Sequence, residues 1–405
     1  MINCPECGSG GLCVKYYKVV IHNFDVLVTG DISQPLRDAE VIVSENGVIT
    51  FIGSADGVDF SDAQVVIDAK NSTVLPGLID NHTHPAMSEY SPRSGNHNWI
   101  WHSLQGGVTS MISAGEVHVP GLPTDRVGTI AMAIASQRSY MNLRPSGVKM
   151  EAGAPLLNDD FTKEDFKMMA LQGIRHLGEV GIGPVKSAER AAEQVRLARQ
   201  EGIVSITHTG GPSIAASQRM GAEEVLEIQP DIVGHINGGY TALAPSAIRC
   251  LCEGCLGALE IVHNGNELAA ITTLNYAREL GQLSRIVLGT DSPAGCGVPA
   301  MGLLRTIALL SSFGGVPPEV AICFATGNTA KVRKLNRGIL AIGKESDILI
   351  ACPPLGGTRA TVLSSLEYGD LPSISAILID GRIVQRQSKN SPPPSIVPDI
   401  KVAMG

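Results

Sequence analysis

Residues 174–293 repeat one pattern, in which a short apolar run ends in a polar residue close to glycine or another small residue. The five copies read IRHLGEVG (174–181), VSITHTGG (204–211), IVGHINGG (232–239), LEIVHNG (259–265) and IVLGTDSP (286–293). The polar residues that end them, Glu179, His208, His235, His263 and Asp291, are spaced by 29, 27, 28 and 28 positions. A helical stretch separates consecutive runs. One strand and one helix in each repeat of this length predict a (β/α)8 TIM-type barrel, an α/β fold.

Three further runs of the same kind lie upstream, at 79–84, 108–115 and 147–153, and bring the number to eight. The stretches between the runs carry helix signals, such as Thr162 with Asp165 three residues later and the pair Pro317-Pro318. A doubly wound open sheet is the alternative fold, but such a sheet does not require eight units.

Both ends of the chain are rich in strand-forming residues instead. Asn46-Gly47 lies between two apolar runs, which is a strong hairpin signal. Each end is too small to bury a core alone, so we predict that the two ends form one small β-sandwich domain. The expected organisation is a Cys-containing tail at 1–17, a first sandwich segment at 18–75, the barrel at 76–335, a second sandwich segment at 336–387 and a C-terminal tail at 388–405.

The composition restricts the class of function. The 405 residues are 44% hydrophobic and 17% charged, which is typical of a globular protein, and the net charge of −8 argues against nucleic acid as a partner. The absence of a long apolar run argues against a membrane, and no signal pattern precedes the first strand. Nine scattered cysteines suit a reducing cytoplasm. Cys4, Cys7 and Cys13 could offer three thiolates to zinc, but no fourth ligand is evident and we favour a flexible or optional extension.

Metal-ligand residues gather at the expected strand ends. His82 and His84 form H-x-H after a buried strand, where residues two apart share a face and both imidazoles can reach one ion. H-x-H alone is a weak signal, because structural histidines at strand ends are common. The single ligand-type residues at later strand ends strengthen it. The sequence therefore predicts a metal centre at one barrel face, built from His82, His84, Glu179, His208, His235 and Asp291.

These motifs resemble the amidohydrolase superfamily. The resemblance rests on LPGLIDNHTH at 75–84, on the later histidines and Asp291, and on GILAIGKESDILI at 338–350. Within the superfamily, four stretches are similar to the enamidases, the cyclic-amide hydrolases of bacterial nicotinate fermentation. They are HTGG (208–211), HINGG (235–239), GGVTSMISAG (106–115) and ATGN (325–328). The likeness extends from about residue 18 to residue 395.

The resemblance implies two divalent metal ions. His82, His84 and Asp291 would hold the more buried ion, and His208 and His235 the more exposed one. Glu179 would bridge them, at a position where many members of the superfamily carry a carboxylated lysine; if Glu179 is structural, the site is mononuclear. Zinc suits these ligands, and iron is an alternative at one position. Asp291 would transfer a proton from water to the leaving nitrogen as the catalytic residue.

The expected substrate is a small cyclic amide, a reduced 6-oxonicotinate or a near relative, whose ring opening could release ammonia. Candidate substrate contacts are Arg93, Lys149, His263, Asn264 and Tyr240. A solvated loop explains Arg93 as well, and pairing with a carboxylate explains Lys149 as well.

Three alternatives remain at this point. A dihydroorotase- or hydantoinase-like ring hydrolase or a nucleobase-type deaminase would use the same ligands. A non-catalytic assembly protein on the same fold is the alternative from another class. We expect a homo-oligomer with a small-molecule substrate.

Overall fold

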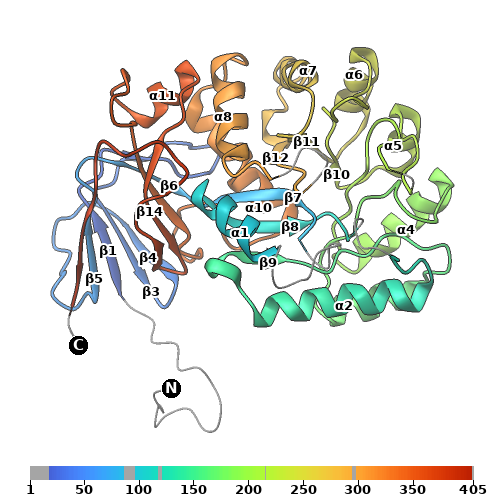
Figure 1. The fold of residues 1–405 in the computed structure, drawn as a ribbon, viewed down its shortest axis with the longest axis horizontal. Helices are drawn as coiled ribbons and strands as arrows, with labels where there is room; N and C mark the ends of the chain where they lie inside the picture. The colour runs from blue at the N-terminus through green and yellow to red at the C-terminus, as the bar shows by residue number, and fades with distance from the viewer. Residues whose placement is uncertain (1–17, 86–95, 117–120, 215, 294–297, 404–405) are drawn as a thin grey trace, which may run out of the picture.

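The computed structural model describes residues 18–85, 96–116, 121–214, 216–293 and 298–403. Its larger body contains two parallel three-stranded sheets with helices outside them (Figure 1). One sheet joins β7 (Leu78–Thr83), β8 (Val108–Ser113) and β9 (Lys149–Glu151), and the other joins β10 (Ile232–Val233), β11 (Ala258–Val262) and β12 (Ile286–Gly289).

Two less regular segments, 174–180 and 204–207, connect the sheets. Parallel bridges pair His176 with Val204, Val180 with Thr207 and Ile206 with Ile232. Another parallel bridge, between Thr83 and Ser292, brings the end of β12 to β7. On its other side, the segment 174–180 lies next to the chain that follows β9. There the Gly178 amide donates a hydrogen bond of 2.8 Å to the carbonyl oxygen of Pro155. The predicted runs thus lie next to one another, and the ladders and bridges that join them are parallel.

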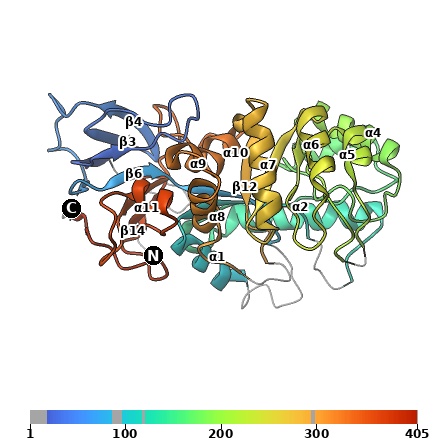
Figure 2. The ribbon, with the colours of Figure 1, turned by 90° about the horizontal axis from the view of Figure 1, so that it is seen from above.

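Helices cover the outside of this arrangement (Figure 2). Several begin at polar caps: Asp125, Ser187 and Asn266 each accept a hydrogen bond from an amide of the first turn. The helices are α1 (Asn96–Gln105), α2 (Arg126–Asn142), α3 (Lys163–Leu171), α4 (Ala188–Gln200), α5 (Ala222–Ile228), α6 (Pro245–Gly254), α7 (Glu267–Glu279), α8 (Gly302–Ser312), α9 (Pro318–Phe324) and α10 (Gly327–Arg333), with the 3-10 turns Pro145–Gly147 and Leu283–Arg285.

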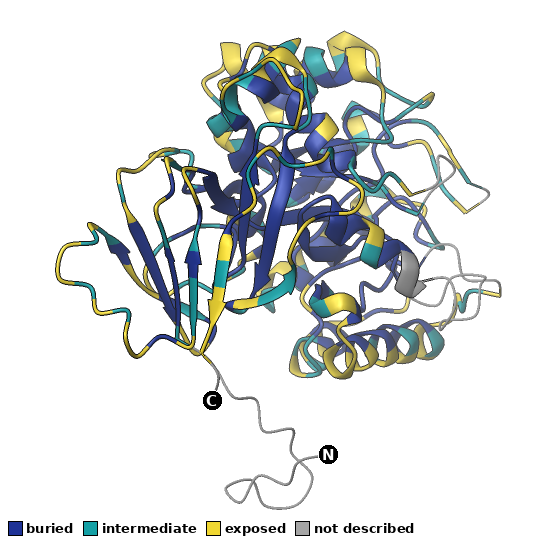
Figure 3. Cartoon of the chain, turned by 60° about the vertical axis from the view of Figure 1, so that its left-hand side comes forward, coloured by how far each residue is buried: buried dark blue, intermediate teal, exposed yellow. Residues whose placement is uncertain are grey.

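The two chain ends form two five-stranded sheets that share a buried aliphatic core. The first has the order β16-β5-β1-β3-β4 and the second β15-β14-β13-β6-β2. Figure 3 shows their inner strands buried beside the larger body. The strands are β1 (Val19–His22), β2 (Val26–Leu27), β3 (Val41–Glu45), β4 (Val48–Gly53), β5 (Val65–Asp68), β6 (Thr73–Pro76), β13 (Ile348–Cys352), β14 (Ser373–Ile379), β15 (Arg382–Gln385) and β16 (Asp399–Val402), and helix α11 (Val362–Tyr368) precedes β14.

The pairing between the chain ends is direct. Strand β6 lies antiparallel to β13, with Pro76 opposite Ile348 and Thr73 opposite Ala351. Only Gly77 separates β6 from β7, so this pairing fixes the first strand of the larger body. A side chain at Gly77 would collide with Thr109, which explains the glycine.

The segment after residue 388 differs from the predicted tail. Its last described residues form β16, which pairs with β5 from Asp399–Asp68 to Val402–Val65. Ser388 and Lys389 also hydrogen-bond to Gln105. The segment is extended because its prolines disfavour helix, and an extended chain can complete a sheet edge.

No helix among the described residues combines the length and the apolar character needed to cross a bilayer.

Candidate metal centre

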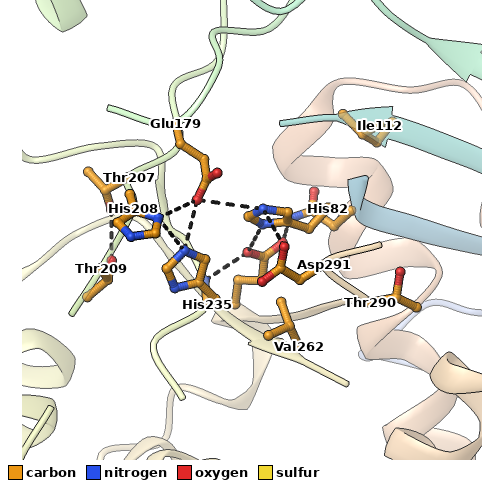
Figure 4. A network of polar contacts seen from close by, with 12 residues as sticks. His82, Ile112, Glu179, Thr207, His208, Thr209, His235, Val262, Thr290 and Asp291 are labelled. Atoms are coloured by element: carbon orange, nitrogen blue, oxygen red, sulfur yellow. Dashed lines mark hydrogen bonds and ion pairs between the residues drawn. The ribbon is translucent and has the colours of Figure 1, made fainter. Parts of the chain in front are cut away.

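Six ligand-type side chains meet at the carboxyl ends of the parallel strands. Figure 4 shows His82, Glu179, His208, His235 and Asp291 of this set. They form two groups of three, in which the ligand atoms lie within 4.8 Å of one another. Five of the six residues are buried, whereas the side chain of Asp291 is 26% exposed and faces the open side. The first group is His82, His84 and Asp291, and the second is Glu179, His208 and His235.

Each histidine of the first group is held by a hydrogen bond at its Nδ1 atom. Nδ1 of His82 lies 2.8 Å from Glu260 Oε2, and Nδ1 of His84 lies 2.7 Å from the carbonyl oxygen of Gly115. Both Nε2 atoms therefore face Asp291 Oδ1, at 3.6 Å from His82 and 3.4 Å from His84. Nε2 of His82 is buried and has no hydrogen-bond partner. An imidazole held at one nitrogen, with the other directed at a carboxylate cluster, is the arrangement of a metal ligand.

Glu179 lies between the two groups. Its Oε1 is 2.8 Å from His235 Nε2 and 3.1 Å from His208 Nδ1. The same carboxylate is 3.7 Å from His82 Nε2 and 3.8 Å from His84 Nε2. A carboxylate can use both oxygens as ligands, so this position suits a bridge between two cations.

The electrostatics of the site also suit cations. Burial raises the pKa of the Asp291 carboxyl, but the neighbouring His82, His84 and His235 outweigh it and hold that pKa below its ordinary value. Burial opposes a charged His82, yet Glu260, Glu179 and Asp291 raise its pKa well above the ordinary value. The three carboxylates, Glu179, Glu260 and Asp291, thus favour positive charge on the groups that lie between them.

Two of the six residues have strained backbones. His235 has a φ of 27° and Asp291 a φ of 59°, both in the left-handed region that non-glycine residues rarely adopt. Such strain is concentrated at functional sites, where the surrounding structure maintains it.

Two buried acids that we did not single out from the sequence hold this centre in place. Glu260 also accepts hydrogen bonds from the Asn81 side chain and, at 2.9 Å, from the amide of His235. Asp80 accepts from the amide and hydroxyl of Thr290 at 2.8 and 2.6 Å and so positions the turn before Asp291. Burial raises the pKa of Asp80 to about 7. An isolated acid within an apolar strand, as in ALEIV (258–262), is the signal that could have revealed Glu260.

The predicted substrate contacts are placed differently. Arg93 lies outside the described residues. Lys149 does not reach the centre, because it begins β9 whereas the ligands follow strand ends, and its Nζ contacts Glu345, Asp347 and Asp380 at 2.6, 2.7 and 2.7 Å. The expected substrate role of Lys149 is therefore corrected to an ion pair.

The other three candidates lie on the face of the metal centre. Asn264 donates to the backbone oxygen of Asp291 at 2.8 Å. His263 lies 3.4 Å from the Thr306 hydroxyl, and Tyr240 is 87% exposed with its hydroxyl 3.3 Å from the Ser213 carbonyl. Each of these hydrogen bonds goes to a group other than the six ligand side chains.

Comparison with known proteins identifies the family. The enamidase of Eubacterium barkeri is 42% identical over 376 residues, which are 93% of this chain and 97% of that enzyme. This chain belongs to the enamidase family. A crystal structure of enamidase, a member of the amidohydrolase superfamily, matches with a TM-score of 0.91 at 42% identity and covers 95% of this chain and 100% of its own. No protein-family model matches the chain.

The enamidase family places the protein among hydrolases of carbon–nitrogen bonds other than peptide bonds. A D-hydantoinase structure shares the fold, with a TM-score of 0.67 at 15% identity over 93% of this chain and 97% of that one. That identity is too low to indicate function. The enamidase relationship does not favour the hydantoinase-like, deaminase or non-catalytic alternatives. The TIM-barrel-type fold and the resemblance to enamidases are confirmed.

Proposed function

We propose that this protein opens a small cyclic amide by enamidase-like hydrolysis at a centre of two divalent metal ions. The observation that carries the proposal is Glu179, whose carboxylate lies between His82 and His84 on one side and His208 and His235 on the other. Membership of the enamidase family supports the same reaction class.

The residues fit two ions. His82, His84 and Asp291 would hold one, His208 and His235 would hold the other, and Glu179 would contact both. Zinc suits this nitrogen and oxygen set, with iron as an alternative at one position. Bound ions of this kind supply a hydroxide nucleophile at neutral pH and a Lewis acid for the amide carbonyl.

Asp291 is the group that moves the proton. Its carboxylate is held ionised by the surrounding imidazoles and is the most exposed of the six ligands, so it can reach both water and substrate. Water adds at the carbonyl carbon, its proton passes to Asp291, and Asp291 returns it to the ring nitrogen as the carbon–nitrogen bond breaks. Glu260 contributes by holding His82 in one orientation.

We propose a reduced 6-oxonicotinate or a near relative as the substrate. Opening such a ring enamide gives a carboxylate and an enamine, and a second water converts the enamine into an aldehyde with release of ammonia. Arg93 remains the candidate cation for the substrate carboxylate, with His263, Asn264 and Tyr240 as further candidate contacts.

We extend the proposal to the molecule as a whole. The eight parallel segments would close into a (β/α)8 barrel spanning 76–335, and the two terminal sheets would form a β-sandwich from 18–75 and 336–387. A homo-oligomer in the cytoplasm is proposed as well. The described cysteines, Cys250, Cys252, Cys255, Cys323 and Cys352, are free, which suits a reducing compartment.

A substrate assay tests the proposal. Purified protein with measured zinc and iron content is offered a reduced 6-oxonicotinate, a neutral lactam of the same ring size and a hydantoin, with ring opening and ammonia measured in parallel. We expect the acidic enamide to react fastest and to release one ammonia per ring opened. Faster opening of the hydantoin without ammonia would contradict the enamidase assignment, and turnover by metal-free protein would contradict the metal mechanism.

A further inference from the structure

A cavity lies at the end of the parallel strands opposite the metal centre. It has a volume of about 430 Å³ and is lined by residues from the starts of the fourth and fifth segments, including Arg175, His176 and Gly202. The ligands Glu179 and His208 lie at the far ends of the same two segments. Because the segments are parallel, the cavity and the metal centre occupy different faces of the molecule.

The charges around this cavity do not balance. Among the acids that line it, Glu151 pairs with Arg337 at 2.6 Å and Glu345 pairs with Lys149 at 2.6 Å. Glu201 is the remaining acid of the lining, against three further cations, Arg175, Arg333 and Lys334. Among the lining residues alone, four cations face three acids, an excess of one positive charge.

Arg333 is the most unusual of these cations. Its residue is only 2% exposed, and in the described part of the chain it makes no ion pair with a carboxylate. Its Nε donates to the side-chain oxygen of Asn81 at 2.6 Å, and Nη2 donates to the Asn81 carbonyl at 3.0 Å. Burial lowers the pKa of Arg333 to about 10, which marks the cost of a buried guanidinium without a direct counter-ion.

His176 presents an unused hydrogen-bond donor. It is 1% exposed, and its Nδ1 lies 3.4 Å from Arg333 Nη1. A guanidinium can only donate, so Nδ1 is the acceptor and the proton of the neutral ring is on Nε2. Burial and the cations Arg333, Arg337, Arg175 and Lys334 lower the pKa of His176 well below its ordinary value, which keeps the ring neutral. Nε2 is buried and has no partner, and the same is true of Nε of Arg337.

We propose that this cavity is a binding site for a small oxyanion of the phosphate type, separate from the metal centre. Such a ligand has several acceptor oxygens, which match the free N–H groups of His176 and Arg337. Its negative charge would offset Arg175, Lys334 and the buried Arg333. A volume of about 430 Å³ accommodates phosphate with its bound water or a small phosphate ester.

Titration of the metal-loaded protein with inorganic phosphate, followed by calorimetry at neutral pH, tests the site. The variant Arg175→Gln/Lys334→Asn removes two exposed charges, and asparagine tolerates the left-handed backbone of Lys334, whose φ is 59°. We expect the dissociation constant to rise about 10-fold or more, because two charge-assisted contacts are lost. The matched control, Arg386→Gln/Lys401→Gln, removes the same charge from the terminal sheets and should keep the wild-type value.

Two further variants separate the effect of the His176 hydrogen-bond donor from the effect of charge on phosphate binding. His176→Asn keeps an acceptor near the Nδ1 position but has no donor at the Nε2 position, so it should weaken phosphate binding several-fold. Glu201→Gln removes an opposing charge and should tighten it. The proposal is overturned if wild-type protein shows no saturable binding, or if the Arg175/Lys334 variant binds as tightly as the control, since phosphate would then occupy the metal centre or another surface.

Discussion

At the scale of single residues, Asp291 combines a strained backbone with a position beside the histidine ligands. It follows β12, adopts a strained backbone, and faces two imidazoles on one side and the open site on the other. Asn81, Asp80 and Glu260 hold the neighbouring backbone and side chains, so the strain is imposed by a buried polar network. Proton transfer is therefore assigned to Asp291, whereas the buried residues Asp80, Asn81 and Glu260 hold the surrounding structure in place.

Replacing Asp291 with asparagine should reduce kcat by about 10²- to 10⁴-fold, the usual contribution of a general base. One oxygen remains available to the metal, so elemental analysis should show near-normal metal content. The control is Asp38→Asn on the exposed surface. Near-normal turnover of the Asp291 variant would remove this residue from the mechanism.

Glu260 is predicted to act through His82 as a positioning residue. It accepts hydrogen bonds from Asn81, His82 and the amide of His235, and the amide group of glutamine cannot accept from all three. Glu260→Gln should weaken metal binding by about 10- to 100-fold. Competition with a chelator measures this change, with the exposed Glu227→Gln as control; unchanged metal affinity would show that Glu260 has a purely structural role.

The six proposed ligands could be found from the sequence because strand ends of a barrel converge on one face. The structure brings all six together. Lys149 was misassigned because the start and end of a strand as short as β9 cannot be told apart by apolar pattern. Glu260 escaped notice because its partners, Asn81 and His235, are distant in sequence and only the fold brings them together.

At the scale of elements, Lys149 joins β9 to the second terminal sheet. Its ammonium contacts Asp347, which is 1% exposed at the side chain, and two further acids. Lys149→Met would leave these carboxylates without their shared cation. We expect the free energy of unfolding to fall by about 3–5 kcal/mol, the usual effect of breaking a buried pair. Denaturant unfolding measures it, and the exposed Lys167→Met should change it little; equal values for both variants would contradict this role.

The carboxylate of Asp165 at the start of α3 predicts how the free energy of unfolding depends on pH. Burial raises the pKa of Asp165, but hydrogen bonds from Arg126 and from Thr162 outweigh burial and lower it below the ordinary value. A carboxylate with a lowered pKa stabilises the fold above the pKa of the unfolded chain and loses this effect as the pH falls through the folded value.

Asp165→Asn should therefore cost about 1–3 kcal/mol of unfolding free energy at neutral pH. The difference from wild type should shrink below about pH 4, where the unfolded carboxyl begins to bind protons. Unfolding curves from pH 3 to pH 7 give the comparison, and a difference that does not vary with pH would contradict it.

Helix starts were predictable where a polar cap or proline marks them. Helix α3 begins after the expected cap Thr162, and α9 begins at Pro318 of the expected pair Pro317-Pro318. The fourth and fifth segments were expected as strands but form only isolated bridges, because their polar and glycine residues interrupt the ladder. Strand β16 escaped prediction because DIKV (399–402) is short and polar and follows prolines.

At the scale of the whole molecule, the terminal sheets depend on residues from both ends. A chain ending at Gly343 lacks β13 to β16, so β6 loses β13, one of its two neighbours, and the shared core is opened. We expect that chain to be rapidly degraded in limited proteolysis. A chain ending at Ser395 loses only the edge strand β16 and should fold with a lower unfolding midpoint. Equal protease resistance of the two truncated chains would show that the larger body folds independently.

The pairing of β6 with β13 has a consequence for how the protein is made. Ile348 is synthesised 272 positions after Pro76, its partner in the sheet. At about 5–20 residues per second, a ribosome needs roughly 15–50 s to cover that distance. During this time β6 has an unpaired edge and the apolar face of the first sheet is uncovered, a combination that favours aggregation. Chaperone demand should therefore be greatest while the middle of the chain is still being translated.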